Sequence, residues 1–390
     1  MLSIIQNMIL AYIKKYGTVN FEEIQEIVNE PLVLLAKEFK RLYNDKYIEK
    51  IDDKFKITDK AKNDNIGEWD FWIDEWNPND FFNTDTKLDF EINEKGYPNI
   101  HDKKDLDKLL QLKYVNRSAY HVFLLCTKNK TREIMAPSLK LKQRQRWILN
   151  NILERYILPD CVHGFAKGKS IVTNALCHVN QKEIACIDIE NFFPSISEKV
   201  VYKIFQDLGY ENKVAMELSK LCTYDGVLPQ GAPTSPMLAN IALRELDSNM
   251  QKYAEYNNLN YSRYADDLTL SGNCDITQHL NRMIQEVEKC GYRVNNNKTH
   301  IMKDNYRKIV TGLVVNETVK VPKNYKRLFR QEIYYCKKLG IEQHLKNTGR
   351  ESAVNFREYM YGKAYFIKMV EPENGTRLLK ELDDIFDLYV

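Results

Sequence analysis

The stretch Asn260-Tyr-Ser-Arg-Tyr-Ala-Asp-Asp-Leu-Thr-Leu-Ser271 contains two adjacent carboxylates, Asp266 and Asp267, between short runs of strand-forming residues at 261–263 and 268–270. This pattern predicts a β-hairpin with both acids at its tip. Neighbouring carboxylates repel each other, so a compact fold tolerates them best at the surface or around a cation. Taken alone, the pair is more simply interpreted as a solvated acidic turn. The interpretation as a cation site depends on further residues elsewhere in the chain.

A third carboxylate lies upstream in Ile184-Ala-Cys-Ile-Asp-Ile189, where every residue except Asp188 is apolar. Such a run predicts a buried strand that carries one acid to its end. Asp188 together with the acidic pair provides the oxygen ligands that a two-metal phosphoryl-transfer site needs, with ions about 3.5–4 Å apart. Carboxylates that leave room for water and phosphate ligands suit Mg²⁺.

Between these blocks lies Leu228-Pro-Gln-Gly-Ala-Pro-Thr-Ser-Pro236, a stiff loop. Ser235 as N-cap and Pro236 in the first turn predict that a long helix follows, to about residue 256. The three blocks, in this order, resemble the palm of reverse transcriptases. Tyr264-Ala-Asp-Asp267 matches that family's third catalytic block, the Asp188 segment its first and Gln230-Gly231 its second.

The resemblance implies a fold and a set of catalytic residues. The fold is an α+β right-hand polymerase with fingers, a split βαβ palm and an α-helical thumb. The implied cofactor is a pair of Mg²⁺ ions, with Mn²⁺ as a substitute, held by Asp188, Ile189, Asp266 and Asp267. Lys298, in Asn295-Asn-Asn-Lys298, stands where the family carries a lysine proposed to protonate the departing pyrophosphate.

The resemblance also implies a dNTP site. A hairpin is expected from residue 120 to about 134, and its Lys128 and Arg132 would contact the triphosphate, for which a guanidinium is well shaped. Without the resemblance both are ordinary surface charges. Gln230 and Gly231 would meet the incoming nucleotide. Phe193, five residues after Asp188, would exclude a 2′-OH, although a core position for this ring remains open.

Two further motifs narrow the resemblance. Asn174-Ala-Leu-Cys-His178 and Val310-Thr-Gly312 look like the paired signatures of retron reverse transcriptases. A lone histidine is more often structural than a ligand. The resemblance implies recognition of RNA or primer, and the residues expected to contribute are Asn174, His178, Tyr264, Val310, Thr311, Gly312, Lys323, Lys326, Arg327 and Arg330.

The chain divides into four segments by composition and pattern. Residues 1–62 combine helical periodicity with a hairpin signal at 47–57, which predicts a small winged helix-turn-helix domain for contact with nucleic acid or protein. Residues 63–100 form an acidic, Trp-rich linker or arm. Residues 101–312 are expected to form the fingers and palm, and residues 313–390 a basic, RNA-binding thumb.

Composition limits the class of protein. With 390 residues, 44% hydrophobic and 28% charged, the chain suits a soluble globular protein of several domains. The net charge of +3 means that a nucleic-acid surface must come from segregated charge. The eight cysteines show no metal-binding spacing and are expected to be free thiols. Neither a signal peptide nor a membrane span is expected, which predicts a cytoplasmic location.

The sequence therefore predicts an RNA-directed DNA polymerase of a retron. The resemblance implies a cognate structured non-coding RNA as template and primer, with dNTPs as substrates. It also implies multicopy single-stranded DNA (msDNA) primed from an RNA 2′-OH, and an effector protein in an anti-phage defence system. One alternative is another bacterial reverse transcriptase, for example of the group II intron lineage. A second is a winged-helix nucleic-acid-binding protein without catalysis, against which the three clustered carboxylates argue.

Overall fold

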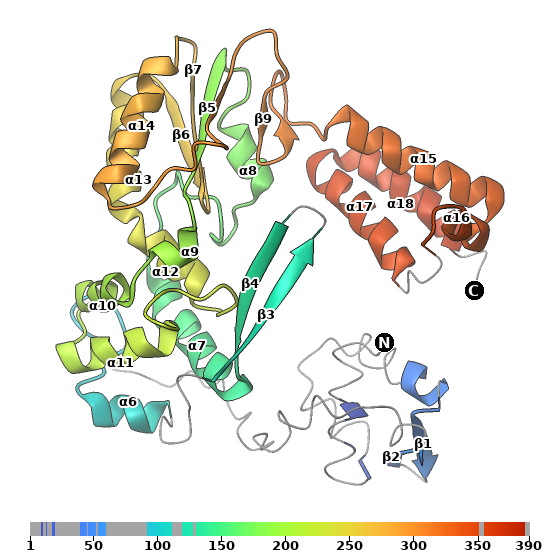
Figure 1. The fold of residues 1–390 in the computed structure, drawn as a ribbon, viewed down its shortest axis with the longest axis horizontal. Coiled ribbons are helices and arrows are strands. Elements are labelled where there is room, and N and C mark those ends of the chain that lie inside the picture. Colours follow the sequence, from blue (N-terminus) through green and yellow to red (C-terminus); the bar gives the residue numbers. More distant parts are fainter. Residues whose placement is uncertain are drawn as a thin grey trace. The chain divides into compact units, whose positions relative to one another are not determined.

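A computed structural model describes residues 9–10, 13, 18–19, 40–44, 46–51, 54–59, 92–110, 119–127, 130–350 and 355–386 (Figure 1). The chain forms two compact units, Met1–Asn151 and Ile152–Val390, each with its own internal contacts. The boundary falls inside the segment predicted to hold both fingers and palm.

The first strands described in the first unit form a small hairpin. β1 (Ile48–Ile51) pairs antiparallel with β2 (Lys54–Ile57), and Phe55 also bridges to Val19. This is the hairpin predicted at 47–57. Residues 20–39 and 60–91, which include most of the acidic segment, lie outside the described residues, so the winged helix-turn-helix and the Trp-rich arm stay predictions.

The remainder of the first unit is a helix, a second hairpin and a further helix. α6 (Lys103–Leu109) precedes β3 (Tyr120–Thr127) and β4 (Lys130–Pro137), which pair antiparallel and confirm the predicted second hairpin. α7 (Leu139–Asn151) follows and is tied back to the hairpin by Gln145 Nε2, which donates to the Tyr120 hydroxyl at 2.8 Å.

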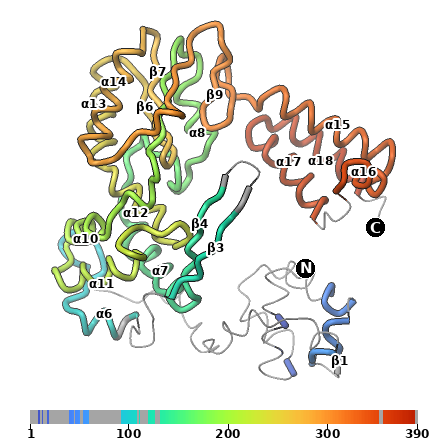
Figure 2. Tube along the Cα trace, viewed as in Figure 1, coloured from blue at the N-terminus to red at the C-terminus, as the bar shows by residue number. Residues whose placement is uncertain are grey.

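The second unit is built on a four-stranded antiparallel sheet in the order β6-β7-β5-β8. The strands are β5 (Glu183–Asp188), β6 (Asn260–Tyr264), β7 (Asp267–Gly272) and β8 (His300–Met302). Figure 2 shows the green trace of β5 beside the yellow trace of β7, although the two are far apart in sequence. Most side chains of β5, β6 and β7 are buried, because helices cover both faces of the sheet.

Helices surround this sheet and carry the connecting loops. α13 (Arg244–Tyr256) and α14 (Thr277–Lys289) contact the sheet together, and α8 (Ile171–Leu176) contacts β6. The other elements between β5 and β6 are α9 (Phe192–Ser195), α10 (Glu198–Asp207), α11 (Asn212–Cys222) and α12 (Ser235–Ala242). A 3-10 turn, η4 (Leu153–Arg155), opens the unit.

The long helix predicted for residues 235–256 is two helices. Leu243, with φ −92° and ψ 8°, separates α12 from α13. Pro236 lies in the first turn of α12 as predicted, but Thr234 rather than Ser235 takes the N-cap position. The break lets the two helices present polar side chains to the same strand from different directions.

Two short strands, β9 (Ile309–Val310) and β10 (Leu313–Val314), lead to a helical C-terminal part. It consists of α15 (Lys323–Leu339), α16 (Ile341–Asn347), α17 (Phe356–Val370) and α18 (Pro372–Phe386). Its core contains Phe329, Met360 and Leu382, all fully buried. The sequence predicted helices in this part of the chain, and the described residues confirm them, whereas its role as a thumb stays a prediction. No helix among the described residues combines the length and the apolar character that crossing a membrane requires.

Candidate active site

Three carboxylates meet where β5 ends and the β6–β7 turn begins. Asp188 is the last residue of β5 and pairs across the sheet with Asp267, the first residue of β7. Asp266 lies in the turn, and its carbonyl accepts a hydrogen bond from the Ile189 N–H at 3.0 Å. The predicted hairpin and strand thus bring Asp188, Asp266 and Asp267 together.

These carboxylates disturb one another electrostatically. Partial burial and then the negative charge of Asp188 raise the pKa of Asp266. Partial burial, followed by the charges of Asp266 and Asp188, raises the pKa of Asp267 to about 7. Repulsion among closely spaced carboxylates is what a bound cation would relieve.

The loop at 295–298 carries Lys298, the only side chain among the described residues that forms an ion pair with Asp188. Lys298 Nζ lies 2.5 Å from Asp188 Oδ2, and Asn295 Nδ2 lies 3.4 Å from Oδ1. The Asn295 N–H also donates to the Asp188 carbonyl at 2.8 Å, which fixes the loop on the strand end. Desolvation lowers the pKa of Lys298, but its hydrogen bond and attraction to Asp188 outweigh this and raise it.

The donor chemistry fits a divalent cation, although no preformed cage of three His, Cys, Asp or Glu side chains exists among the described residues. Asp266 and Asp267 retain carboxylate oxygens beside Asp188, and carboxylates are preferred ligands of Mg²⁺. An incomplete protein ligand set is what Mg²⁺ accepts when substrate phosphates and water complete its coordination. Asp188, Asp266 and Asp267 are therefore the residues that would hold the metal.

Phe193, which is predicted to face the sugar, differs in burial from its neighbour Phe192. Phe192 is buried, whereas the neighbouring Phe193 is only half-buried. The Phe193 ring centroid lies 5.5 Å from that of Phe192 and 6.2 Å from that of Phe165, whose side chain is exposed. Phe193 is thus more accessible than Phe192, and its place at the sugar stays a prediction.

The other residues predicted to bind dNTP are spread over two units. Gln230 is half-buried and Gly231 is exposed, and Gly231 has φ 139°, in the loop before α12. Arg132 is exposed on β4, where it pairs with Leu125, and belongs to the first unit. Lys128 lies outside the described residues.

The prediction that Asn174 and His178 contact RNA is wrong for this structure, because both side chains are buried. Asn174 keeps 1% of its surface exposed and His178 none. Ser262 Oγ donates to Asn174 Oδ1 at 2.8 Å, so His178 Nε2–H must donate to Ser262 Oγ, 2.7 Å away. His178 Nδ1 then accepts from the Ser271 hydroxyl at 2.7 Å. The histidine joins α8 to the two strands of the catalytic hairpin.

Val310-Thr-Gly312 forms the β9–β10 turn. Thr311 and Gly312 have φ 46° and 81°, which makes a two-residue hairpin turn with both residues in the left-handed region. Thr311 Oγ1 donates to the carbonyl of Ile171, the first residue of α8, at 3.2 Å. Val310 is buried in an apolar cluster with Ala175, so its side chain is not available to RNA.

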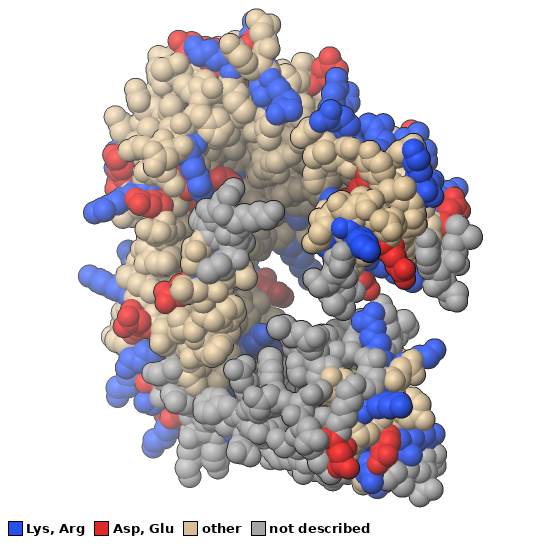
Figure 3. Space-filling view, turned by 45° about the vertical axis from the view of Figure 1, so that its right-hand side comes forward, with Lys and Arg blue, Asp and Glu red and all other residues tan. Residues whose placement is uncertain are grey.

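The remaining predicted RNA-contact residues differ in exposure. Lys323, Arg327 and Arg330 are exposed on α15, whereas Lys326 is half-buried and pairs with Glu371 at 2.6 Å. Tyr264 is half-buried and pairs with Asp267 across the hairpin. In the space-filling view, Lys and Arg side chains gather on the helical C-terminal part, at the right of the picture (Figure 3).

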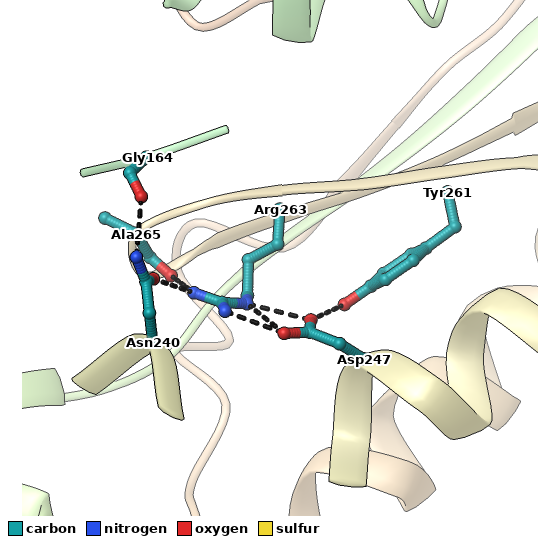
Figure 4. A network of polar contacts seen from close by, with 6 residues as sticks. All are labelled: Gly164, Asn240, Asp247, Tyr261, Arg263 and Ala265. Atoms are coloured by element: carbon teal, nitrogen blue, oxygen red, sulfur yellow. Dashed lines mark hydrogen bonds and ion pairs between the residues drawn. The ribbon is translucent and has the colours of Figure 1, made fainter. Parts of the chain in front are cut away.

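A buried polar network that was not predicted from the sequence lies beside the catalytic turn. Arg263 and Asp247 form an ion pair at 2.7 Å with no exposed surface on either side chain. Tyr261, Asn240, Ala265 and Gly164 complete the network (Figure 4). The available signal was Arg263 itself, because it interrupts a strand-like run directly before the acidic turn.

The comparisons with known proteins agree with this geometry. Residues 116–326 match the family model "Reverse transcriptase (RNA-dependent DNA polymerase)". The chain is 34% identical over 314 residues to the retron Ec86 reverse transcriptase of Escherichia coli, covering 77% of this chain and 94% of that protein. The chain belongs to the retron reverse transcriptases. As a retron reverse transcriptase it is an RNA-directed DNA polymerase, and the group II intron and non-catalytic alternatives are not supported.

Two further comparisons cover only part of this retron reverse transcriptase. The retron Mx162 reverse transcriptase of Myxococcus xanthus is 33% identical over 290 residues, which cover 65% of this chain and 58% of that protein. A solved telomerase from Candida albicans, in complex with a telomeric RNA fragment, aligns with TM-score 0.41 and 14% identity over 68% of this chain and 63% of that chain. That likeness is too weak to support a structural argument.

Proposed function

We propose that this retron reverse transcriptase copies a cognate structured non-coding RNA into msDNA, with synthesis primed from an RNA 2′-OH. The observation that carries the proposal is the meeting of Asp188, Asp266 and Asp267 at one end of the palm sheet in a chain whose relatives are retron enzymes. Copying RNA requires only such a site and a groove for the duplex. Retron-type priming additionally requires that one particular RNA end reach it.

The carboxylates are proposed to hold two Mg²⁺ ions, which Mn²⁺ can replace, with the main chain at Ile189 beside them. Bound there, the ions would activate the primer hydroxyl and stabilise negative charge on the departing pyrophosphate. Lys298 is proposed to donate a proton to the leaving group. Its ammonium group lies 2.5 Å from Asp188, beside the carboxylates that are proposed to hold the metal.

Substrate selection is assigned to residues near the sugar and the triphosphate. Phe193 is proposed to exclude a 2′-OH, because it is accessible beside the buried Phe192. Gln230, Gly231, Lys128 and Arg132 are proposed to contact the incoming dNTP. Tyr264 and the turn residues Thr311 and Gly312 are proposed to lie near the primer.

The helical thumb is proposed to bind the RNA. Lys323, Arg327 and Arg330 are exposed cations on one helix, a distribution suited to phosphate contacts whose strength falls with salt. An effector protein and a role in anti-phage defence are part of the proposal, as is contact of the N-terminal segment with nucleic acid or protein.

The test is to express the protein with its native flanking DNA and analyse the nucleic acid that co-purifies. The expected product is a short single-stranded DNA attached to RNA, which debranching enzyme releases. Asp266→Asn serves as the matched control and should yield none. Unbranched DNA would leave the polymerase activity standing and remove the 2′-OH priming.

A further inference from the structure

Arg263 is the largest of the fully buried side chains in the described part of the protein. It lies on β6, two residues before Ala265, and faces away from the Ser262 side of the strand. Its Nε and Nη2 bind Asp247 of α13 at 2.9 and 2.7 Å, and Tyr261 donates to the same carboxylate at 2.9 Å. Burying a charged pair is costly even when the pair is well made, and apolar replacements often stabilise a fold at least as well.

The guanidinium also makes contacts that an apolar side chain cannot. Arg263 Nη1 donates to the Ala265 carbonyl and to Asn240 Oδ1 of α12, both at 3.0 Å. Asn240 Nδ2 in turn donates to the Gly164 carbonyl at 2.9 Å. Figure 4 shows this chain of contacts from α13, through Arg263, to the turn and the Gly164 segment.

The bound carbonyl belongs to the residue directly before Asp266. Ala265 has φ 56°, a left-handed conformation that costs energy for any residue other than glycine. A Cβ placed on Gly164 would lie 2.3 Å from the Ala265 nitrogen, so the Gly164 backbone packs directly on the turn. The strained turn is therefore held by Arg263 from one direction and by Gly164 from another.

A second carbonyl of the turn is fixed as well. The Asp266 carbonyl accepts from the Ile189 N–H at 3.0 Å, which links the turn to the segment after Asp188. With the carbonyls of Ala265 and Asp266 both engaged, the peptide planes on either side of the Asp266 α-carbon are fixed. The direction of the Asp266 Cα–Cβ bond follows from those planes, and Asp267 shares the second of them.

We propose that Arg263 is the positioning residue of the catalytic turn, with Asp247 as its counter-charge and Asn240 as its link to Gly164. The guanidinium fixes the Ala265 carbonyl, and through it the carboxylates that act on the substrate. The inference rests on the proposed catalytic role of Asp266 and Asp267.

The first experiment uses the double variant Arg263→Met/Asp247→Leu, which removes both charges together, so that neither charge is left buried and unpaired. Tyr261, Asn240 and the Ala265 carbonyl each lose one hydrogen-bond partner. The thermal midpoint should therefore fall, but by less than in a variant that strands one of the two charges. Steady-state dNTP incorporation on an annealed RNA template should show kcat lowered by about a hundredfold, the scale expected of a misplacement near 1 Å. KM for dNTP should change little.

A second variant, Arg263→Lys, separates charge from geometry. The ammonium can still pair with Asp247, but it cannot reach Asp247, Asn240 and the Ala265 carbonyl together. A role limited to the ion pair predicts that lysine restores kcat, which would overturn the proposal. A low kcat in a folded Arg263→Lys enzyme supports it, including the case in which the double variant does not fold.

Lys308→Met is the matched control. Lys308 is a buried cation of the same unit that binds the Gln181 carbonyl at 2.6 Å and does not contact the turn. Its loss should lower the thermal midpoint without changing kcat per folded molecule.

Asp266→Asn distinguishes the catalytic role of the carboxylates from the positioning role of Arg263. If that variant is active, the site assignment fails; if it is inactive while folded Arg263 variants have wild-type kcat, only the positioning role fails.

Discussion

Lys298 Nζ lies 2.5 Å from Asp188 Oδ2 and holds the first catalytic strand to the loop that follows α14. Asn295 reinforces this link through its side chain and through its N–H on the Asp188 carbonyl. The same lysine thus pairs with one of the three clustered carboxylates, and it is proposed to donate a proton to the leaving group. These two roles can be separated by substitution.

Lys298→Ala should slow nucleotide incorporation by about a hundredfold or more, the range in which general-acid groups contribute. Lys298→Arg retains the positive charge near Asp188 but cannot give up a proton at neutral pH. Single-turnover rates of the two variants decide the role. A full rate in Lys298→Arg would assign the residue to electrostatics alone.

Asp266→Asn and Asp267→Asn should each abolish metal-dependent dNTP incorporation, since charge stabilisation of this kind contributes several kcal/mol. Neither should lower the thermal midpoint measured without metal, because each removes one of the carboxylates that repel its neighbours. Loss of activity together with unfolding would point to a structural role. Near-wild-type extension would remove the metal-site assignment.

Phe193→Ala should relax discrimination against rNTPs more than it lowers dNTP use, because the half-buried ring is proposed to face the sugar. Phe192→Leu is the matched control, since its ring is buried in the core. It should lower stability and leave the ratio of dNTP to rNTP incorporation unchanged. Identical ratios for wild type and Phe193→Ala would place Phe193 in the core as well.

Acid should destabilise the second unit through its buried histidines. Burial lowers the pKa of His178 to about 3 and that of His163 to about 4. Between these values and about 6.5, the unfolded chain binds protons that the folded chain does not. Stability is therefore fully present above about 6.5 and falls as the pH is lowered towards 4, by about 1.4 kcal/mol per pH unit for each histidine.

Urea unfolding between pH 7 and 4.5 measures this slope. His178→Gln removes one titrating group and should reduce the slope by about one proton. Equal slopes for wild type and His178→Gln would contradict the buried neutral state of His178.

Arg327→Ala and Arg330→Ala should weaken RNA binding and reduce the dependence of log Kd on log salt by about one ion per residue lost. Lys326→Ala should instead lower thermal stability, because Lys326 pairs with Glu371 within the thumb. The comparison of Lys326 with its neighbour Arg327 separates packing from RNA contact. A salt slope that Arg327→Ala leaves unchanged would argue against phosphate contact at that position.

Elements of the fold could be predicted from the sequence where a local pattern of residues determines the structure. Alternating residues around Asp266 and Asp267 defined the hairpin, and the apolar run before Asp188 defined the central strand. The helical C-terminal part was expected from the resemblance to reverse transcriptases, and the β3–β4 hairpin from strand-forming residues at the place where that family has its fingers hairpin.

Hydrogen bonds and ion pairs between residues far apart in the sequence could not be predicted from local sequence pattern. Asp247 lies on a helix rich in charge, and nothing local distinguishes it from a surface acid until it meets Arg263. Asn174 and His178 offered hydrogen bonds, but whether RNA or two serines on neighbouring strands would take them depends on how α8 packs. The break at Leu243 likewise depends on tertiary contacts, because no glycine or proline marks it.

The burial of His178 between Ser262 and Ser271 bears on how such motifs can be used to sort enzymes. A histidine that satisfies two strand hydroxyls is constrained by the architecture of the palm, and an exchange at position 178 would call for compensating exchanges at 262 or 271. In this chain the histidine of the motif is a structural residue of the palm, and its side chain is not exposed. Residues that select the RNA are therefore better sought on exposed surfaces such as α15.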